Sequence, residues 1–184
     1  MADAVSLTAS ALILGCAVTL AVSAIWKLRA PAQFRGVLRA HAIIAPRRVP
    51  AVGRLVPLAE LAAAAGCAAV LGPDLRQVLL VVRLGAALAV ALAVAFLCYL
   101  GVLARRHGFS GIACGCTGAH DRFGPVSFLR AAALGLAAGS AWLTDPLAGA
   151  SNLRSGLLSI TVGAVVLGLA TWSSTRGAAS RRSR

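Results

Sequence analysis

The sequence predicts an all-α integral membrane protein, folded as a helical bundle of about five transmembrane helices: a four-helix core and one more. Three observations support this class. The 184 residues are 59% hydrophobic and only 12% charged, the mean hydropathy is +0.86, and several apolar runs approach the roughly 20 residues that cross a hydrocarbon core. The runs lack the alternation of barrel strands, and backbone polar groups in lipid must be bonded internally, so each run should be helical.

Five runs account for these helices, at residues 5–26, 55–71, 78–103, 126–143 and 153–172. No basic residue precedes the first run, which is longer than the apolar part of a secretory signal, so we expect an uncleaved membrane anchor. Residues 1–172 then form one transmembrane domain. Residues 173–184 are rich in Ser, Arg and Gly and are expected to be a disordered cytoplasmic tail.

Basic residues gather in the first and third connections and in the tail. They are Lys27, Arg29, Arg35, Arg39, Arg47, Arg48 and Arg54, then Arg105, Arg106 and Arg122, and finally Arg176, Arg181, Arg182 and Arg184. By the positive-inside rule these parts are cytoplasmic, which predicts a multi-pass protein of the plasma membrane with its N-terminus outside and its C-terminus in the cytoplasm. The net charge of +13 therefore indicates contact with anionic membrane lipids, and no nucleic-acid binding is expected.

A polar segment between two apolar runs contains Cys114, Gly115 and Cys116, the strongest candidates for chemistry. A disulfide across one intervening residue closes a small, strained ring, and strained disulfides exchange readily. Gly115 supplies the backbone freedom that such a ring requires. Basic side chains nearby would stabilise a thiolate; they are Arg105, Arg106, His107, His120 and Arg122. Cys114 and Cys116 are thus the predicted catalytic thiols, with Cys114 expected to attack, and no cofactor is expected.

Two other interpretations of the thiol pair stay open. Cys114 and Cys116 could bind Cu(I) or Zn²⁺ together with His120 or His107, or they could be loop residues without chemistry. A closed structural zinc site usually takes four ligands, and a second cysteine pair is missing. Cys98, near the same membrane face, is a candidate resolving thiol.

Cys16 and Cys67 lie inside apolar runs, where cysteine usually packs as a small hydrophobe. The connection at residues 29–53 interleaves apolar residues with arginines and is expected to contain an amphipathic helix on the membrane surface. His41, in the same connection, is expected at the interface.

Glu60 lies inside the second apolar run, where an ionisable side chain is costly. We expect it to face the bundle interior and to pair with Lys27, Arg54 or Arg130, either as an interhelical ion pair or as a proton acceptor beside the thiols. Arg130, at the head of the fourth run, either anchors in the headgroups or steadies a nearby negative charge. Glu60, Arg130, Lys27 and His120 are therefore the predicted supporting residues.

A family resemblance appears between residues 20 and 140. Residues 114–118 read CGCTG and are followed by VSFLRAAAL at 126–134, a pattern similar to the CGCFG segment and downstream arginine of the methylamine utilisation protein MauE family, which resembles the wider DoxX-like membrane proteins. Thr117 and Ala131 depart from the family pattern, and neither departure touches the thiols. The first half supports the resemblance with a series in the family's order: Lys27, Pro31, Phe34, Pro46, Pro57 and Glu60.

The resemblance implies a membrane component that works with a thioredoxin-like redox partner in the maturation or transport of an exported client protein, as in methylamine dehydrogenase biogenesis. Two alternatives belong to other classes: a transporter or metal-handling membrane protein whose cysteines are ligands, and a non-catalytic DoxX-like scaffold subunit. The client is outside the membrane, yet the charge pattern puts Cys114 and Cys116 on the cytoplasmic side. A relay of reducing equivalents across the bilayer, or a thiol segment that dips into the bundle, would reconcile the two, as would the opposite topology.

Overall fold

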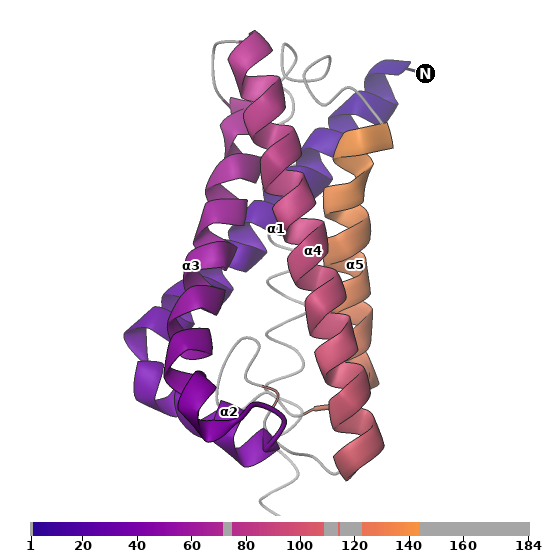
Figure 1. Ribbon diagram of the computed structural model, residues 1–184. Helices are drawn as coiled ribbons and strands as arrows, with labels where there is room; N and C mark the ends of the chain where they lie inside the picture. Colours follow the sequence, from indigo (N-terminus) through magenta and orange to yellow (C-terminus); the bar gives the residue numbers. More distant parts are fainter. Residues whose placement is uncertain (1, 72–74, 109–113, 115–122, 144–184) are drawn as a thin grey trace, which may run out of the picture.

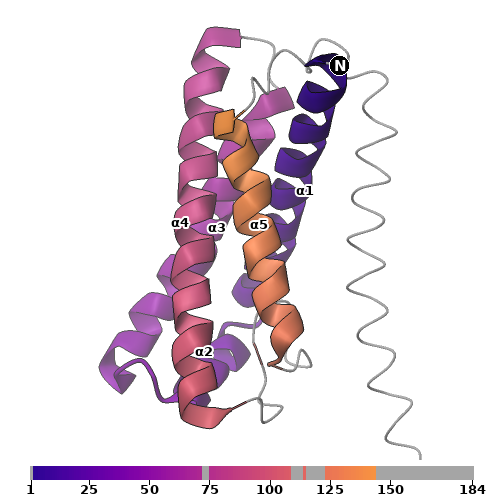
Figure 2. The same ribbon diagram turned by 90° about the vertical axis from the view of Figure 1, so that its right-hand side faces the viewer.

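Four long antiparallel helices form a closed bundle in the computed structural model, which describes residues 2–71, 75–108, 114 and 123–143 (Figures 1 and 2). They are α1 (Ala2–Arg29), α3 (Val49–Ala68), α4 (Leu75–His107) and α5 (Pro125–Leu143). α1 packs on α3, α3 on α4, α4 on α5, and α5 back on α1. The predicted all-α bundle is confirmed, and these helices match the first four apolar runs. The fifth run and the basic tail lie outside the described residues.

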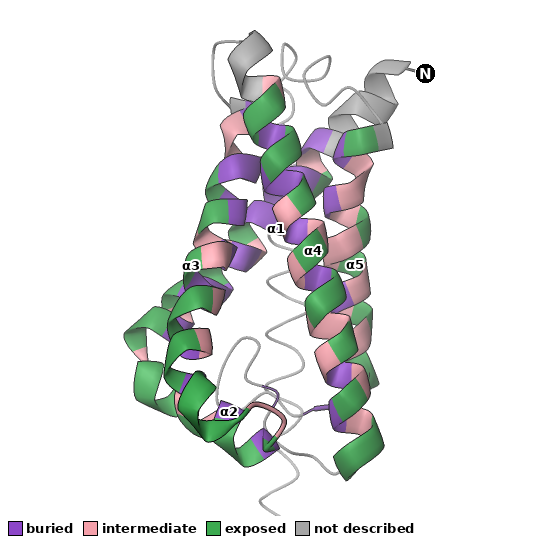
Figure 3. Cartoon of the chain, in the orientation of Figure 1, coloured by how far each residue is buried: buried purple, intermediate pink, exposed green. Residues whose placement is uncertain are grey.

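The outer surface of the bundle is apolar. Figure 3 shows exposed residues along every long helix. Large hydrophobic residues are among them, including Leu12, Val18, Val22, Leu55, Leu58, Leu80, Leu84, Val94, Leu129 and Leu136. Within the described part of the chain, three stretches have the length and hydropathy of membrane spans, Ser10–Arg29, Pro46–Ala68 and Leu79–His107. An apolar exterior around helices of this length is the surface of a membrane protein.

Small residues pack the four long helices together around the main buried cluster, a region that we call the waist of the bundle. The main buried cluster draws on all four long helices and includes Ala17, Ala63, Ala86, Ala89 and Ala138. Beside it, the backbones of α3 and α4 touch, because a Cβ added to Gly66 would lie 2.6 Å from the Cα of Gly85. Lipid offers no hydrophobic drive for helix association, so close backbone approach between small residues supplies the packing energy instead.

A short helix, α2 (Pro31–His41), lies across one end of the bundle, between α1 and the 3-10 turn η1 (Pro46–Arg48) (Figure 1). Pro31 suits its first turn, and Ala42 ends it in the left-handed conformation at φ 52°. The spacing of Phe34, Leu38 and His41 puts them on one face, and all three are buried. An amphipathic helix was expected in this connection, and it is present; its apolar face, however, packs onto α3 rather than facing lipid.

The Gly66–Gly85 contact makes a matched pair of substitutions on α4 informative. Gly85→Ala should lower the free energy of unfolding by about 1–3 kcal/mol, because its new methyl group meets α3 backbone atoms 2.6 Å away. Gly101→Ala is the control, since a Cβ there meets nothing within 4 Å. Thermal unfolding in detergent measures both, and equal unfolding temperatures for the two variants would contradict the close α3–α4 contact.

Candidate functional site

A buried ion pair joins α1 to α3. The Lys27 ammonium donates to Glu60 Oε1, and the two residues are only 5% and 9% exposed. Of the three partners expected for Glu60, the structure selects Lys27. Arg54 is exposed on α3, and Arg130 is half-buried on α5. Glu60 faces the bundle interior as the sequence predicts.

Ser23 completes this pair. It precedes Lys27 by four residues, so both side chains leave the same face of α1. The Lys27 ammonium donates to Ser23 Oγ at 3.0 Å, and the Ser23 hydroxyl lies 3.4 Å from each oxygen of Glu60. Every described buried side-chain nitrogen or oxygen has a hydrogen-bond partner, which is what makes a charge tolerable in this environment.

α2 covers the ion pair from outside. The Lys27 Nζ lies 5.3 Å from the centre of the Phe34 ring, within range of a cation–π interaction. Phe34 and Leu38 belong to a second buried cluster with Val49, against which Trp26 and Tyr99 pack. Helices α1, α2, α3 and α4 therefore all contribute to the surroundings of one charged pair.

His41 and Tyr99 form a second buried polar pair that the sequence analysis missed. His41 was expected at the membrane interface, but it is 1% exposed and its Nδ1 lies 2.6 Å from the Tyr99 hydroxyl. The expectation was wrong because the loop folds α2 inward and pairs its last residue with α4. Two signals could have found the pair: the spacing of His41 from Phe34 and Leu38, and a lone tyrosine within an apolar run, whose hydroxyl requires a partner.

The end of α4 holds the end of α2 in place. His107 Nε2 donates to the His41 carbonyl oxygen at 3.3 Å, and the Arg106 guanidinium donates to the Ala42 carbonyl oxygen at 3.1 Å. The last carbonyls of a helix have no partner within it, and cationic side chains satisfy them well. Arg106, counted earlier among the basic residues that contact anionic lipids, thus also fastens α2 to α4, together with His107.

Cys114 lies at this same end of the bundle. It is 5% exposed and packs in a third buried cluster with Leu100 and Leu103 of α4 and with Phe123, and Ile43 packs against that cluster. Leu100 follows Tyr99 directly and Ile43 lies two residues after His41, so the buried sulfur of Cys114 is adjacent to the segments that carry the His41–Tyr99 pair. The free thiols of the described chain are Cys16, Cys67 and Cys98, and Cys114 is not among them.

Cys98 does not face this cluster. It is exposed on α4, whereas Leu100 and Leu103, which contact Cys114, lie on a different face of the same helix. Its orientation gives no support to a resolving role.

Cys116 and His120 lie outside the described residues, so their part in the predicted site is still a prediction. For the same reason, the metal interpretation of the thiol pair is not tested by the absence of a cluster of three or more His, Cys, Asp or Glu side chains in the described part.

The buried polar and charged side chains of the described residues gather at one end of the bundle. Buried polar or charged side chains of the described chain are Ser10, Ser23, Lys27, His41, Glu60 and Ser127, and all except Ser10 lie toward the end that α2 covers. This end combines a charge pair, a histidine–tyrosine hydrogen bond and a buried cysteine sulfur. Such a set can exchange electrons at sulfur and move protons nearby, while the opposite half of the bundle offers mostly apolar packing.

Substitutions at Glu60 separate a structural role from proton chemistry. Glu60→Ala should lower the free energy of unfolding by about 3 kcal/mol, because it strands a buried ammonium. Glu60→Gln should cost less, since the amide keeps hydrogen bonds to Ser23 and Lys27. Thermal unfolding in detergent measures both, with the lipid-facing Leu58→Ala as a control on the same helix.

A double substitution sharpens this test. Replacing both partners, as Lys27→Met with Glu60→Leu, removes the stranded charge and should recover most of the lost stability. Full recovery of function along with stability would assign the pair a purely structural role. Equal and complete loss of function in Glu60→Gln and Glu60→Ala, with normal protein levels, would instead argue for proton chemistry at the carboxylate.

Comparison with known proteins adds one match. A family model described as methylamine utilisation protein MauE matches residues 5–144. No curated protein and no solved structure matches the chain. The matched range contains α1 from Val5 onward, α2 to α5, both buried polar pairs, and both Cys114 and Cys116.

Proposed function

Because the chain belongs to the methylamine utilisation protein MauE family, we propose that it is a membrane thiol–disulfide component that uses Cys114 and Cys116 to assist the maturation or transport of an exported protein. Family membership indicates a role in methylamine utilisation. The finer assignment depends on the chemistry of the thiol pair and on its surroundings in the bundle.

The position of Cys114 is the observation that carries this proposal. Its side chain is buried in a cluster with Leu100, Leu103 and Phe123, so one member of the thiol pair is attached to the helical bundle. Two sulfurs one residue apart form a strained disulfide that exchanges readily. A rigid support on one sulfur presents that disulfide to a partner in a fixed orientation.

Exchange with a thioredoxin-like partner then follows ordinary thiol–disulfide chemistry. A thiolate of one protein attacks the disulfide of the other, forming a mixed disulfide and releasing one thiolate. The second cysteine of the attacking pair breaks the mixed bond, so one protein is oxidised by two electrons and the other is reduced. Because Cys114 is 5% exposed, we now assign it the resolving role and assign partner attack to Cys116, the reverse of the order expected from the sequence.

A trapping experiment tests this order. Cys114→Ser removes the resolving thiol and should accumulate a covalent complex with a thioredoxin-like protein that dithiothreitol dissolves. Cys116→Ser and the double serine variant should trap nothing, and Cys98→Ser should behave as wild type. Non-reducing electrophoresis followed by mass spectrometry identifies the complex. If neither single serine variant traps a partner and both mature the client fully, the redox function is wrong, and ligand or scaffold roles take its place.

We further propose a plasma-membrane orientation with the N-terminus outside and the C-terminus in the cytoplasm. The basis is the end of the bundle that carries α2, where Arg29, Arg39, Arg47, Arg105 and Arg106 are exposed. This end also holds Cys114, so the orientation would place the thiol pair on the cytoplasmic side, with cytosolic thiols as its source of electrons.

Reporters fused to each end of the chain measure this orientation. We expect the reporter at residue 184 to be cytoplasmic and the reporter at residue 1 to be outside. Membrane-impermeant maleimide applied to intact cells should leave Cys116 unlabelled and should label it after permeabilisation. Both termini on one side of the membrane would contradict a five-span topology.

A further inference from the structure

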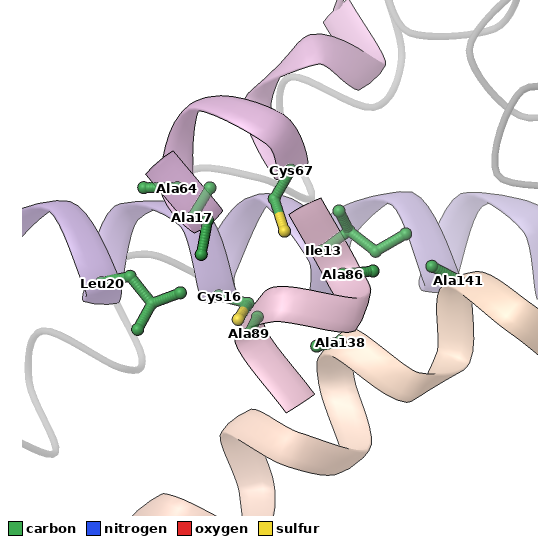
Figure 4. Close-up of a cluster of buried hydrophobic side chains, with 11 residues drawn as sticks. Ile13, Cys16, Ala17, Leu20, Ala64, Cys67, Ala86, Ala89, Ala138 and Ala141 are labelled. Atoms are coloured by element: carbon green, nitrogen blue, oxygen red, sulfur yellow. The ribbon is translucent and has the colours of Figure 1, made fainter. Parts of the chain in front are cut away.

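Two cysteines from distant parts of the chain meet in the centre of the bundle (Figure 4). Cys16 of α1 and Cys67 of α3 lie together in the main buried cluster of the bundle, and Cys16 Sγ lies 3.9 Å from the Leu134 carbonyl oxygen of α5. Both are free thiols, 2% and 0% exposed. We propose that they form a second, membrane-buried dithiol centre, which a small peroxide oxidises to a disulfide linking α1 to α3.

The helix interface around these sulfurs is lined by small residues. A disulfide requires its two Cα atoms to lie about 4.4–6.8 Å apart, and close approach of helices needs small neighbours. Ala17 on α1 and Ala63 and Ala64 on α3 supply them. The other buried members of the cluster are all aliphatic, so each thiol has the other as its one reactive neighbour in the cluster.

Burial determines the class of oxidant. A thiolate of another protein cannot reach sulfurs that are 0–2% exposed, so exchange with a protein disulfide is excluded here. Hydrogen peroxide is small and uncharged and can enter during brief fluctuations of the bundle. This centre therefore differs from the Cys114–Cys116 segment in its co-substrate, and it does not depend on the function proposed for that segment.

The reaction balances in two steps. One cysteine sulfur attacks a peroxide oxygen, the O–O bond breaks, and the products are a sulfenic acid and one water. The second thiol then attacks the sulfenic sulfur and expels its hydroxyl group as a second water, forming the S–S bond. Two thiols and one hydrogen peroxide thus become one disulfide and two waters, with each sulfur losing one electron.

The experiment uses the full chain with Cys98, Cys114 and Cys116 replaced by serine, in membrane vesicles treated with hydrogen peroxide. After acid denaturation and alkylation with N-ethylmaleimide, intact-mass measurement counts the remaining thiols. We expect Cys16 and Cys67 to disappear together, without a singly alkylated intermediate, and dithiothreitol to restore both. With Cys16→Ser added, no second thiol captures the sulfenic acid of Cys67, so excess peroxide should oxidise it further to a sulfinic acid, which dithiothreitol does not restore to the thiol.

A second measurement compares the thermal unfolding temperatures of the oxidised and the reduced protein. The oxidised protein should unfold at a higher temperature than the reduced protein, since a link between α1 and α3 restricts the unfolded chain, and Cys16→Ala with Cys67→Ala should abolish that shift. Independent loss of the two thiols would overturn the proposal. The proposal would also be overturned if Cys16 and Cys67 both remained fully reduced, and so fully alkylated, at a peroxide dose that completely oxidises the exposed Cys98 of the wild-type protein.

Discussion

The buried ion pair between Lys27 and Glu60 is the constraint on which the α2 end of the bundle depends. Removing two charges from water costs several kcal/mol for each ion, and their attraction repays this only with good geometry and further hydrogen bonds. Ser23 supplies those bonds, and Phe34 covers the ammonium. The pair is thus satisfied in one relative register of α1 and α3 and with α2 in one place.

Placement of α2 in turn determines the surroundings of the thiol. Once Phe34 is seated on the ion pair, the following turns bring His41 to Tyr99 and present the last carbonyls of α2 to Arg106 and His107. The loop after α2 then places Ile43 against the cluster that buries Cys114. A continuous series of contacts therefore links the Glu60 carboxylate to the sulfur of Cys114, more than fifty residues later in the chain.

Much of this arrangement could be predicted from the sequence, because its signals are local. Length and hydropathy placed the four long helices, and the cost of a carboxylate in lipid predicted that Glu60 faces inward and pairs with one of three cations. The choice among those cations could not be predicted, since it depends on which helices are neighbours. The His41–Tyr99 and Cys16–Cys67 pairs were missed for the same reason: each brings together residues more than fifty positions apart, and no periodicity within one helix reports such a contact.

The waist and the α2 end of the bundle are packed in different ways. At the waist, alanine and glycine bring helix backbones into contact, which leaves no room for large polar groups. Toward α2 the long helices separate (Figure 1), and the space between them is filled by aromatic rings, the ion pair and the histidine–tyrosine pair. Large polar side chains need partners, and those partners need volume, so the ion pair and the histidine–tyrosine pair lie at the end where the helices diverge. The close packing at the waist keeps those partners in register, and the buried sulfur of Cys114 is held at the α2 end by the helices themselves.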